Sequence, residues 1–435
     1  KWGADTTIRR FSTNSHNWLG GISKIKIDSD NFRYEIGVDV RTYEALHRRG
    51  PETMFGLDGY ISTINGFGFS GNGDRIGTVI VDTYEANPFK DMGTANPNGS
   101  QRYYIGHVDW TGFNGLIEYT GSDKFSAVLQ MGTSRQKYQW EGYYTAAPET
   151  LSRVVTVDGG YIKGGANYRA NDNSNFFFNV GQIMRPPSFD GVFPNADYDF
   201  EEADEILNES FTSFELGYGF RSSNFKGTLN AYHTVWGDRT LRRSTSIDDQ
   251  GVRIIYSGVE QTHQGIEAEM TWYPSNRLRV KGMASLGNWK YTKNFEGDAY
   301  YIDNNQSAGT TGTLYLDGVK IGDAAQTVLY LGLDYKLSSK LSLDLDMMSY
   351  DDLHGRFGPL DNEFNSANNR GSIKLPSFGT TDLGATYRFS FLGYDTLARL
   401  NVNNLFDKEY ISQSQTNFHN EGGRTWNGVN VENNV

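Results

Sequence analysis

Residues 398–411 read Ala-Arg-Leu-Asn-Val-Asn-Asn-Leu-Phe-Asp-Lys-Glu-Tyr-Ile, and this stretch decides the fold. Its first half alternates apolar and polar side chains, which is the period of a β-strand that lies between two unlike surroundings. A polar turn and a tyrosine follow at residues 407–410, as where a strand leaves an apolar layer for water. The pattern predicts a strand over residues 398–411 whose lipid face carries Ala398, Leu400 and Val402.

The composition of the chain also favours β-structure. Its 435 residues include 50 Gly, only 10 Pro, and 27 Tyr, 26 Phe and 8 Trp, a balance typical of strands joined by tight turns. Hydrophobic residues make up 37%, and no run approaches the roughly 18 consecutive apolar residues of a membrane-spanning helix. A transmembrane barrel is compatible with both observations, because only alternate residues of each strand face lipid.

Alternating runs recur along the chain, and the connections between them are alternately short and long. Bacterial outer-membrane barrels have short periplasmic turns and long extracellular loops, and a crossing strand needs about 9 to 11 residues. We therefore predict an all-β fold, a large antiparallel transmembrane β-barrel with about 14 strands in this chain. The predicted strands are residues 18–27, 32–43, 104–120, 125–143, 160–170, 175–184, 212–221, 225–239, 265–273, 278–289, 328–337, 341–350, 381–391 and 398–411.

Three stretches resemble the family of TonB-dependent outer-membrane receptors. Residues 403–410, Asn-Asn-Leu-Phe-Asp-Lys-Glu-Tyr, are similar to the Asn-Leu-Phe-Asp-Lys-x-Tyr pattern of the family's penultimate barrel strand. Residues 181–189, Gly-Gln-Ile-Met-Arg-Pro-Pro-Ser-Phe, resemble a strand end with an Arg-x-Pro-Ser element, and residues 213–218 resemble its Ser-x-Glu-x-Gly-Tyr strand. The residues of the first pattern are Asn403, Asn404, Leu405, Phe406, Asp407 and Tyr410.

This resemblance implies active uptake of a scarce, bulky nutrient across the outer membrane of a Gram-negative bacterium. The nutrient is a siderophore, cobalamin, a glycan or a peptide. In the family, the ligand binds the extracellular loops and a plug domain, and the TonB-ExbB-ExbD energy complex pulls on the plug. The expected partners are therefore outer-membrane lipid, that complex and a surface lipoprotein, and no cofactor is expected.

The strand pattern predicts one domain, residues 1–435, a partial barrel with long extracellular loops. Strand parity places both ends of the sequence on the extracellular side, and residues 427–435 lack the terminal aromatic of a closing strand. We therefore expect the N-terminal plug, the first strands and the final strand to lie outside this sequence, in a whole barrel of the 22-stranded type. Residues 398–411 are then expected to have one unpaired edge.

Candidate ligand-binding residues lie on the polar strand faces and in the loops. Carboxylates on the inner face suit a cationic ligand or arginines of the plug, although a solvated barrel wall is polar on alternate residues in any case. Loop aromatics suit stacking on a sugar or an aromatic chelate, although girdles and loop packing use them more often. The candidates are Arg185, Phe189, Tyr198, Glu267, Glu269, Asp344 and Asp346.

Several other functions are disfavoured by the sequence. A net charge of −12 argues against nucleic acid as a partner, and the absence of cysteine removes thiolate metal sites. Asp351, Asp352 and His354 supply metal-binding groups without a calcium-loop spacing, so no metal site is predicted. Seven scattered histidines without a Gly-x-Ser-x-Gly elbow predict no enzyme. Two alternatives stay open: a passive or secretion-associated barrel without a plug, and a soluble extracellular β-protein.

Overall fold

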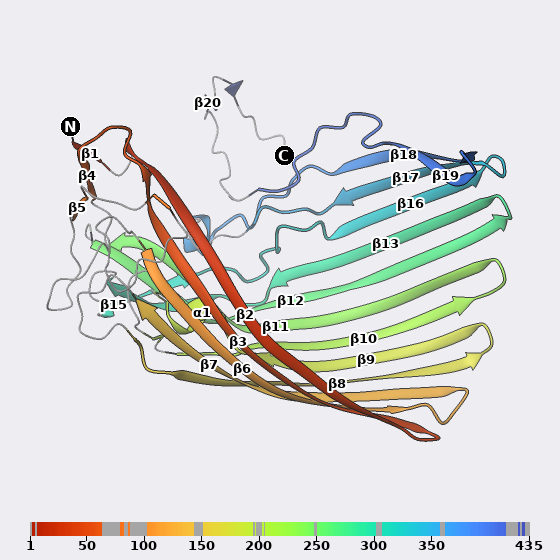
Figure 1. The fold of residues 1–435 in the computed structure, drawn as a ribbon, viewed down its shortest axis with the longest axis horizontal. Coiled ribbons are helices and arrows are strands. Elements are labelled where there is room, and N and C mark those ends of the chain that lie inside the picture. The colour runs from red at the N-terminus through yellow and green to blue at the C-terminus, as the bar shows by residue number, and fades with distance from the viewer. Residues whose placement is uncertain are drawn as a thin grey trace.

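The computed structural model describes residues 2–4, 7–62, 79–81, 86–87, 102–142, 151–194, 196, 202–203, 205–247, 250–301, 307–356, 362–414, 425–426 and 429–430. Its main body is a sheet of 16 strands that curves into an open trough (Figure 1). Fourteen of these strands form a single antiparallel path in which each pairs with the next one along the chain. The predicted all-β fold and strand number are thereby confirmed.

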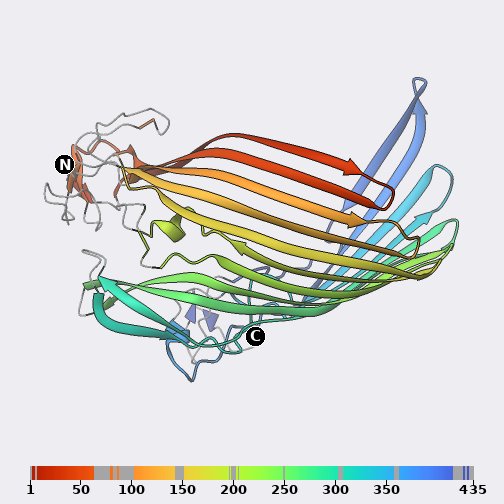
Figure 2. The same ribbon diagram turned by 90° about the horizontal axis from the view of Figure 1, so that it is seen from below.

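The path runs through β2 (Arg9–Asp28), β3 (Phe32–Thr53), β6 (Arg102–Tyr119), β7 (Phe125–Gly142), β8 (Val155–Asn171), β9 (Ser174–Arg185), β10 (Glu209–Arg221), β11 (Phe225–Ile247), β12 (Gln250–Ser275), β13 (Leu278–Tyr291), β16 (Thr327–Lys336), β17 (Leu341–Asp351), β18 (Phe378–Phe391) and β19 (Tyr394–Val402). Among the described residues β2 and β19 do not pair with each other, so each has one free edge and the sheet is open. Seen from below, the strands form one curved layer (Figure 2).

Short and long connections alternate as predicted, except between β11 and β12, where most of the expected long connection is strand. The short turns join β2 to β3, β6 to β7, β8 to β9, β10 to β11, β12 to β13, β16 to β17 and β18 to β19, and they gather at one end of the trough (Figure 1). The β18–β19 turn places Leu392 and Gly393 at φ values of 51° and 83°, the two positive angles of a tight hairpin turn that matches the twist of its strands.

The outer face of the sheet is apolar. Register places Leu216 beside Phe178 and Ala231, and such neighbours extend the apolar surface from strand to strand. Leu19 is 74% exposed, Leu216 is 61% exposed and Leu400 is 67% exposed. Since exposing apolar surface to water costs about 25 cal/mol per Å², a continuous face of this kind suits contact with lipid.

At the long-loop end the strands run further than predicted. The segment 240–264 was expected as a long connection, but residues 240–247 and 250–264 instead continue the ladder of β11 and β12. Two further strands, β14 (Phe295–Tyr301) and β15 (Ser307–Leu314), extend that ladder within a predicted loop. Val252, Tyr256 and Leu314 are fully buried in the core that these four strands share, which explains why the chain continues as β-structure here.

The predicted strand over residues 398–411 is corrected by the structure, because β19 ends at Val402. Asn404 and Asp407 both adopt φ of 49°, which interrupts a strand. The Asn404 side chain accepts a hydrogen bond from the Lys408 backbone at 3.0 Å, and its own backbone N–H donates to Asp382 at 2.7 Å. The ring of Tyr410 stacks on that of Phe378 with centroids 4.1 Å apart. The motif therefore attaches the segment after β19 to β18.

The described residues outside the large sheet form small elements. One sheet consists of β1 (Trp2–Ala4), β4 (Gly59–Ser62) and β5 (Val79–Val81), and another of β20 (Thr425–Trp426) and β21 (Val429–Asn430). The described helices are α1 (Phe189–Val192) and η2 (Asn362–Asn365). Within the described part of the chain, no helix has the length and apolar character needed to cross a membrane.

Candidate functional site

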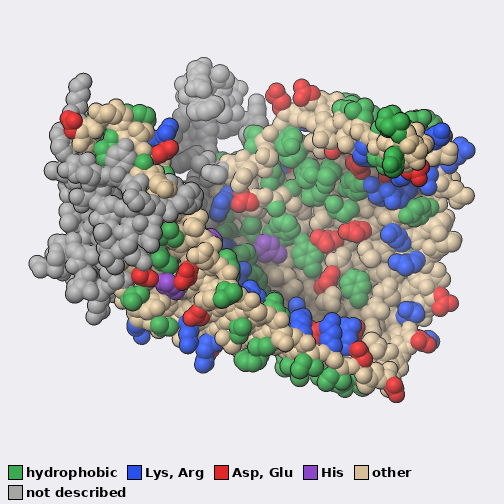
Figure 3. Space-filling view, in the orientation of Figure 1, with side chains coloured by type: hydrophobic (Ala, Val, Ile, Leu, Met, Phe, Trp, Pro, Cys, Tyr) green, Lys and Arg blue, Asp and Glu red, His purple; other side chains and the backbone are tan. Residues whose placement is uncertain are grey.

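The candidate site is the inner wall, which we define as the concave face of the sheet, opposite to the apolar outer face. A view into the trough shows acidic, basic and apolar side chains intermixed on this face (Figure 3). Alternation along each strand produces the contrast, since successive side chains point to opposite faces. The inner wall therefore offers the polar groups that a bound molecule would meet.

Aromatic side chains of the inner wall lie against glycines. A Cβ added at Gly132 would be 2.6 Å from the ring of Tyr161, and one at Gly287 would be 2.8 Å from that of Trp289. The rings thus occupy the space over the backbone instead of standing out into the trough. The same arrangement joins Trp110 to Gly112, Phe177 to Gly217, Tyr232 to Gly265 and Tyr330 to Gly332.

Near the short-turn end, charged side chains form a self-neutralised cluster that we call the lower network. Lys281 Nζ lies 3.4 Å from both Asp334 Oδ2 and Asp346 Oδ1. The Arg399 guanidinium donates to both carboxylate oxygens of Asp344 at 2.9 Å. The predicted ligand residues Asp344 and Asp346 therefore already have cationic partners in the wall. The members of the lower network are Arg279, Lys281, Asp334, Asp344, Asp346 and Arg399.

The predicted residues Glu267 and Glu269 lie on the inner wall of β12. Ser285 Oγ donates to Glu267 at 3.4 Å. Glu269 lines a depression of about 930 Å³ that Arg169 and Lys226 also border. Sequence reasoning missed the neighbouring carboxylate Glu215, which accepts from Asn179 at 2.8 Å and from Asn230 at 3.1 Å. Glu215 and Glu267 belong to hydrogen-bonded parts of the wall, and the structure does not gather Glu267 and Glu269 with Asp344.

Arg185 belongs to a second cluster, toward the long-loop end, that we call the upper shelf. Phe211 and Trp236 stack there with ring centroids 5.0 Å apart. The Arg185 guanidinium lies 5.3 Å from the Phe211 centroid and 5.9 Å from that of Trp236, and it pairs with Glu209. The upper shelf is defined as Arg185, Phe211, Trp236, Arg239 and His263.

A β-bulge places Arg239 on the shelf. Trp236 pairs with Gln261 and Arg239 with Val259, so three steps along β11 match two along β12. Asp238, inside this bulge, has φ of 57°. The extra residue turns Arg239 onto the face of Trp236, where its guanidinium lies 4.0 Å from the ring centroid. Sequence reasoning missed Trp236 and Arg239, although a Gly-Asp pair inside a strand run signals a bulge.

The predicted loop aromatics have a different environment. Phe189, at the start of α1, packs against the buried cluster that includes Tyr104, Trp140 and Phe193. Its ring lies 5.1 Å from that of Phe193 and 6.2 Å from that of Tyr104. Phe189 therefore anchors α1 on the wall as a packing residue. The other predicted aromatic, Tyr198, lies outside the described residues.

The acidic loop after β17 is paired with lysines. Lys320 Nζ lies 3.2 Å from Asp352 Oδ2, and Lys374 Nζ lies 3.1 Å from Asp351 Oδ1. His354 is 7% exposed, and burial lowers the pKa of its imidazole. Over the described part of the chain no group of three potential ligands is arranged to hold a metal ion.

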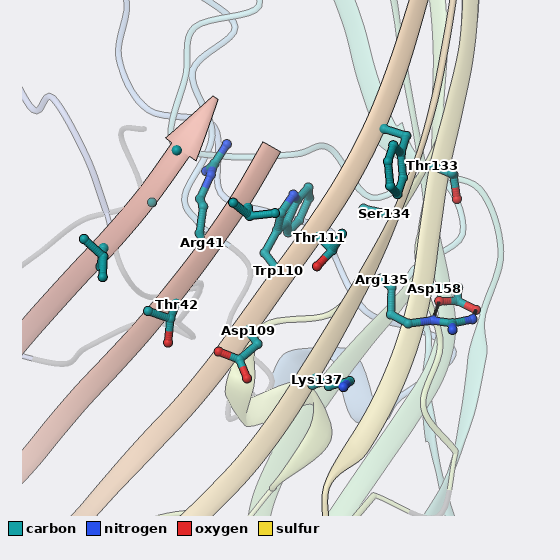
Figure 4. Close-up of a pocket in the computed structure, with 15 residues that line it drawn as sticks. Arg41, Thr42, Asp109, Trp110, Thr111, Thr133, Ser134, Arg135, Lys137 and Asp158 are labelled. Carbon is teal, nitrogen blue, oxygen red and sulfur yellow. Dashed lines mark hydrogen bonds and ion pairs between the residues drawn. The ribbon is translucent and has the colours of Figure 1, made fainter. Parts of the chain in front are cut away.

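A groove of about 830 Å³ is lined by residues of β2, β3, β6, β7 and β8, most of which lie on the outer face. Arg135 donates to both carboxylate oxygens of Asp158 at 2.7 and 2.8 Å, an ion pair drawn in Figure 4. Asp109 stands opposite Lys137 in the strand register. Arg41, which also lines the groove, pairs with Asp39, so the two arginines of the groove have carboxylate partners.

A family model described as TonB dependent receptor-like, beta-barrel matches residues 2–405, and the chain belongs to this family. Family members are outer-membrane β-barrel proteins of Gram-negative bacteria that act as receptors and transporters with the TonB energy transducer, and they are not enzymes. No curated protein matched the chain.

Several solved structures share the fold. The copper transporter OprC has 15% identity and a TM-score of 0.58, with 93% of this chain and 53% of OprC covered. The siderophore receptor PiuA from Acinetobacter baumannii has 13% identity and a TM-score of 0.60, with 93% and 54% covered. The ferric citrate transporter FecA, in unliganded form, has 10% identity and a TM-score of 0.57, with 92% and 51% covered. The chain spans about half the length of these proteins.

Proposed function

We propose that the protein containing this chain lies in the outer membrane, binds a scarce, bulky nutrient and imports it with TonB-coupled energy. The observation that carries the proposal is a sheet of fourteen consecutive strands with an apolar outer face and a polar inner wall, matched to the receptor family over residues 2–405. The candidate nutrients are a siderophore, cobalamin, a glycan or a peptide. The names of the similar structures support a metal chelate among these, since they mention copper, siderophore and ferric citrate.

Energy coupling requires partners beyond this chain. A plug domain with a TonB box would connect the barrel to the TonB-ExbB-ExbD complex, and a surface lipoprotein would cover the ligand. The outer face, with Leu19, Leu216 and Leu400 exposed, would contact lipid. Each of these partners is part of the proposal and is open to a separate genetic test.

The test uses the full-length gene in its own bacterium. A strain that lacks the gene is expected to grow poorly when one nutrient is limiting, and to recover when the gene is restored. Uptake of that labelled nutrient is expected to stop when TonB is deleted. Uptake that continues without TonB would contradict active transport and support a passive barrel. Recovery of the protein in the aqueous phase without detergent would contradict the membrane location.

A further inference from the structure

The outer face carries a belt of aromatic side chains close to the short turns. The ring centroids of Phe32 and Tyr119 are 5.2 Å apart, and those of Tyr387 and Phe389 are 5.6 Å apart. Aromatic rings of this kind mark the level at which a barrel passes from lipid into water. A turn that follows the belt is therefore expected to be polar. The other rings of the belt are Phe125, Phe176, Tyr218, Phe220 and Phe225.

The turn between β18 and β19 differs from the other six short turns in composition. The turns at residues 29–31, 120–124, 172–173, 222–224 and 276–277 contain only polar residues and glycine, and residues 337–340 contain one leucine beside two serines and a lysine. The β18–β19 turn consists of Leu392 and Gly393, and the pair that closes it is Phe391 with Tyr394. The aromatic and apolar character of the outer face thus continues to the tip of this hairpin.

Leu392 occupies a position that the fold alone does not favour. Its φ of 51° lies in the left-handed region, where a turn of this type ordinarily has Asn, Asp or Gly. Its side chain is 80% exposed, and no large apolar side chain in the described part of the chain is more exposed. A leucine with an unfavourable backbone angle and little packing indicates an apolar environment outside the protein.

We propose that the β18–β19 turn inserts into the interfacial region of the periplasmic lipid leaflet, where Leu392 contacts phospholipid. The apolar outer face leads to this turn through Phe391, which is 58% exposed, and Tyr394, which is 76% exposed. The hairpin ends at the same end of the trough as the other short turns, which is the periplasmic end in barrels of this class (Figure 2). The inference rests on the membrane location proposed above.

The backbone limits how deep the turn can lie. Phe391 and Tyr394 form the last pair of the ladder, so the two residues between them lie beyond it. Peptide groups outside a ladder need water, which the hydrocarbon core does not provide. The interfacial region supplies water to these peptide groups and apolar contact to Leu392. The turn is therefore placed at the level of the aromatic belt and not at the centre of the membrane.

Other occupants fit the turn less well. A strand paired to the free edge of β19 would lie beside the ladder, whereas Leu392 lies beyond the last pair of that ladder. A soluble partner on the periplasmic side would meet the ends of the hairpins, where the other six turns are predominantly polar. The exposed rings of Phe391 and Tyr394 lie on the outer face, which is the face that contacts lipid.

The experiment measures the depth of single positions in the full-length protein in phospholipid vesicles. The 435 residues contain no cysteine, so Leu392→Cys adds one thiol for an NBD fluorophore, and labelled wild type is the blank. The vesicles contain phospholipid with a nitroxide quencher at acyl carbon 5 or at acyl carbon 12. We expect the carbon 5 quencher to lower the emission at position 392 at least about twofold, and the carbon 12 quencher to have a smaller effect.

Two matched positions provide the controls. Ser339→Cys lies in the polar β16–β17 turn and is expected to show little quenching by either lipid. Leu216→Cys lies on the outer face, away from the turns, and is expected to be quenched more strongly by the carbon 12 lipid. A mobility shift between boiled and unboiled gel samples establishes that each variant is folded. If Leu392→Cys does not fold, Tyr394→Cys replaces it with the same expected result.

The proposal is overturned if position 392 is quenched no more than position 339 while position 216 is quenched. It is also overturned if the carbon 12 lipid quenches position 392 more than the carbon 5 lipid does, because the turn would then lie deeper than the interface. Absence of quenching at position 216 would instead contradict the membrane location itself. The failure of this inference is therefore distinguishable from the failure of the proposed function.

Discussion

The lower network and the upper shelf are both arginine-containing clusters of the inner wall, yet they differ in how their charges are balanced. Each aspartate of the lower network has a wall cation within 3.4 Å, as Lys281 shows for Asp334 and Asp346. On the shelf Glu209 pairs with Arg185, whereas Arg239 stacks on Trp236 and hydrogen-bonds the side chain of Tyr291. The comparison teaches that the wall holds some of its cations with carboxylates and others with aromatic rings.

The two clusters also arise from different backbone geometry. Arg279, Asp334 and Asp344 stand opposite one another on three regularly paired strands, so sheet register alone assembles the lower network. Arg239 reaches Trp236 only because a bulge reverses the alternation of β11. The regular cluster is held by ion pairs between strands, whereas the irregular cluster is held by a cation that lies over an aromatic ring.

The largest expected effect comes from reversing one charge of the lower network. Lys281→Glu would place a third carboxylate beside Asp334 and Asp346 and should destabilise the protein by about 2 kcal/mol, less than for a fully buried pair because the site is partly exposed. The measurement is the temperature at which the folded gel band is lost. Lys281→Gln is the matched control and should show a smaller decrease. Equal decreases of the unfolding temperature in Lys281→Glu and Lys281→Gln would contradict the interpretation that these charges neutralise one another.

The bulge can be tested separately from the shelf side chains. Asp238→Val should cost about 1–2 kcal/mol, because a β-branched residue disfavours the positive φ that Asp238 adopts. It should also turn Arg239 away from Trp236 and alter the tryptophan fluorescence. Asp238→Gly tolerates the same φ and should leave both stability and fluorescence close to wild type. An undisturbed Asp238→Val variant would contradict the role of the bulge.

A smaller effect is expected for the pair of Arg399 and Asp344, which is partly exposed. Arg399→Gln and Asp344→Asn should each lower the unfolding temperature slightly at low salt, and the double variant should be no worse than either single variant. The decrease should fade near 1 M salt, where the screening length is about 3 Å. A salt-independent loss would mean that the pair acts through packing instead of charge.

The smallest effect concerns His354, which lies in the acidic loop after β17 beside the ion pairs of Lys320 and Lys374. Burial lowers the pKa of His354, and the positive Lys320 and Lys374 act in the same direction, whereas Asp352 opposes them. The unfolded chain therefore binds the proton first. Stability should be unaffected above about pH 6.5 and should fall by less than about 1 kcal/mol as pH drops toward the folded-state pKa. His354→Gln should abolish this slope, and an unchanged slope would assign it to another group.

Sequence reasoning found the regular parts of the fold and missed the irregular ones. Alternation located Leu400 on the outer face and Asp344 on the inner wall, because a strand has a period of two. Alternation predicted that this strand continues beyond Val402, because the periodicity of the sequence does not show that Asn404 adopts a positive φ. It included Arg185 but not Arg239, since a bulge reverses parity without changing composition. Phe189 was predicted to be available to a ligand because strand periodicity does not reveal its packing against Tyr104, which is distant in the chain, or against Phe193, which lies outside the strands.

The aromatic rings that pack over glycines of the inner wall determine how wide the trough is. A residue larger than glycine at Gly132 or Gly217 would lift Tyr161 or Phe177 off the backbone and toward the axis. Such a change would narrow the passage without altering any charged group or hydrogen bond of the shelf. The width of the trough is therefore a property distributed over glycine positions of the backbone, separate from the charged side chains of the inner wall.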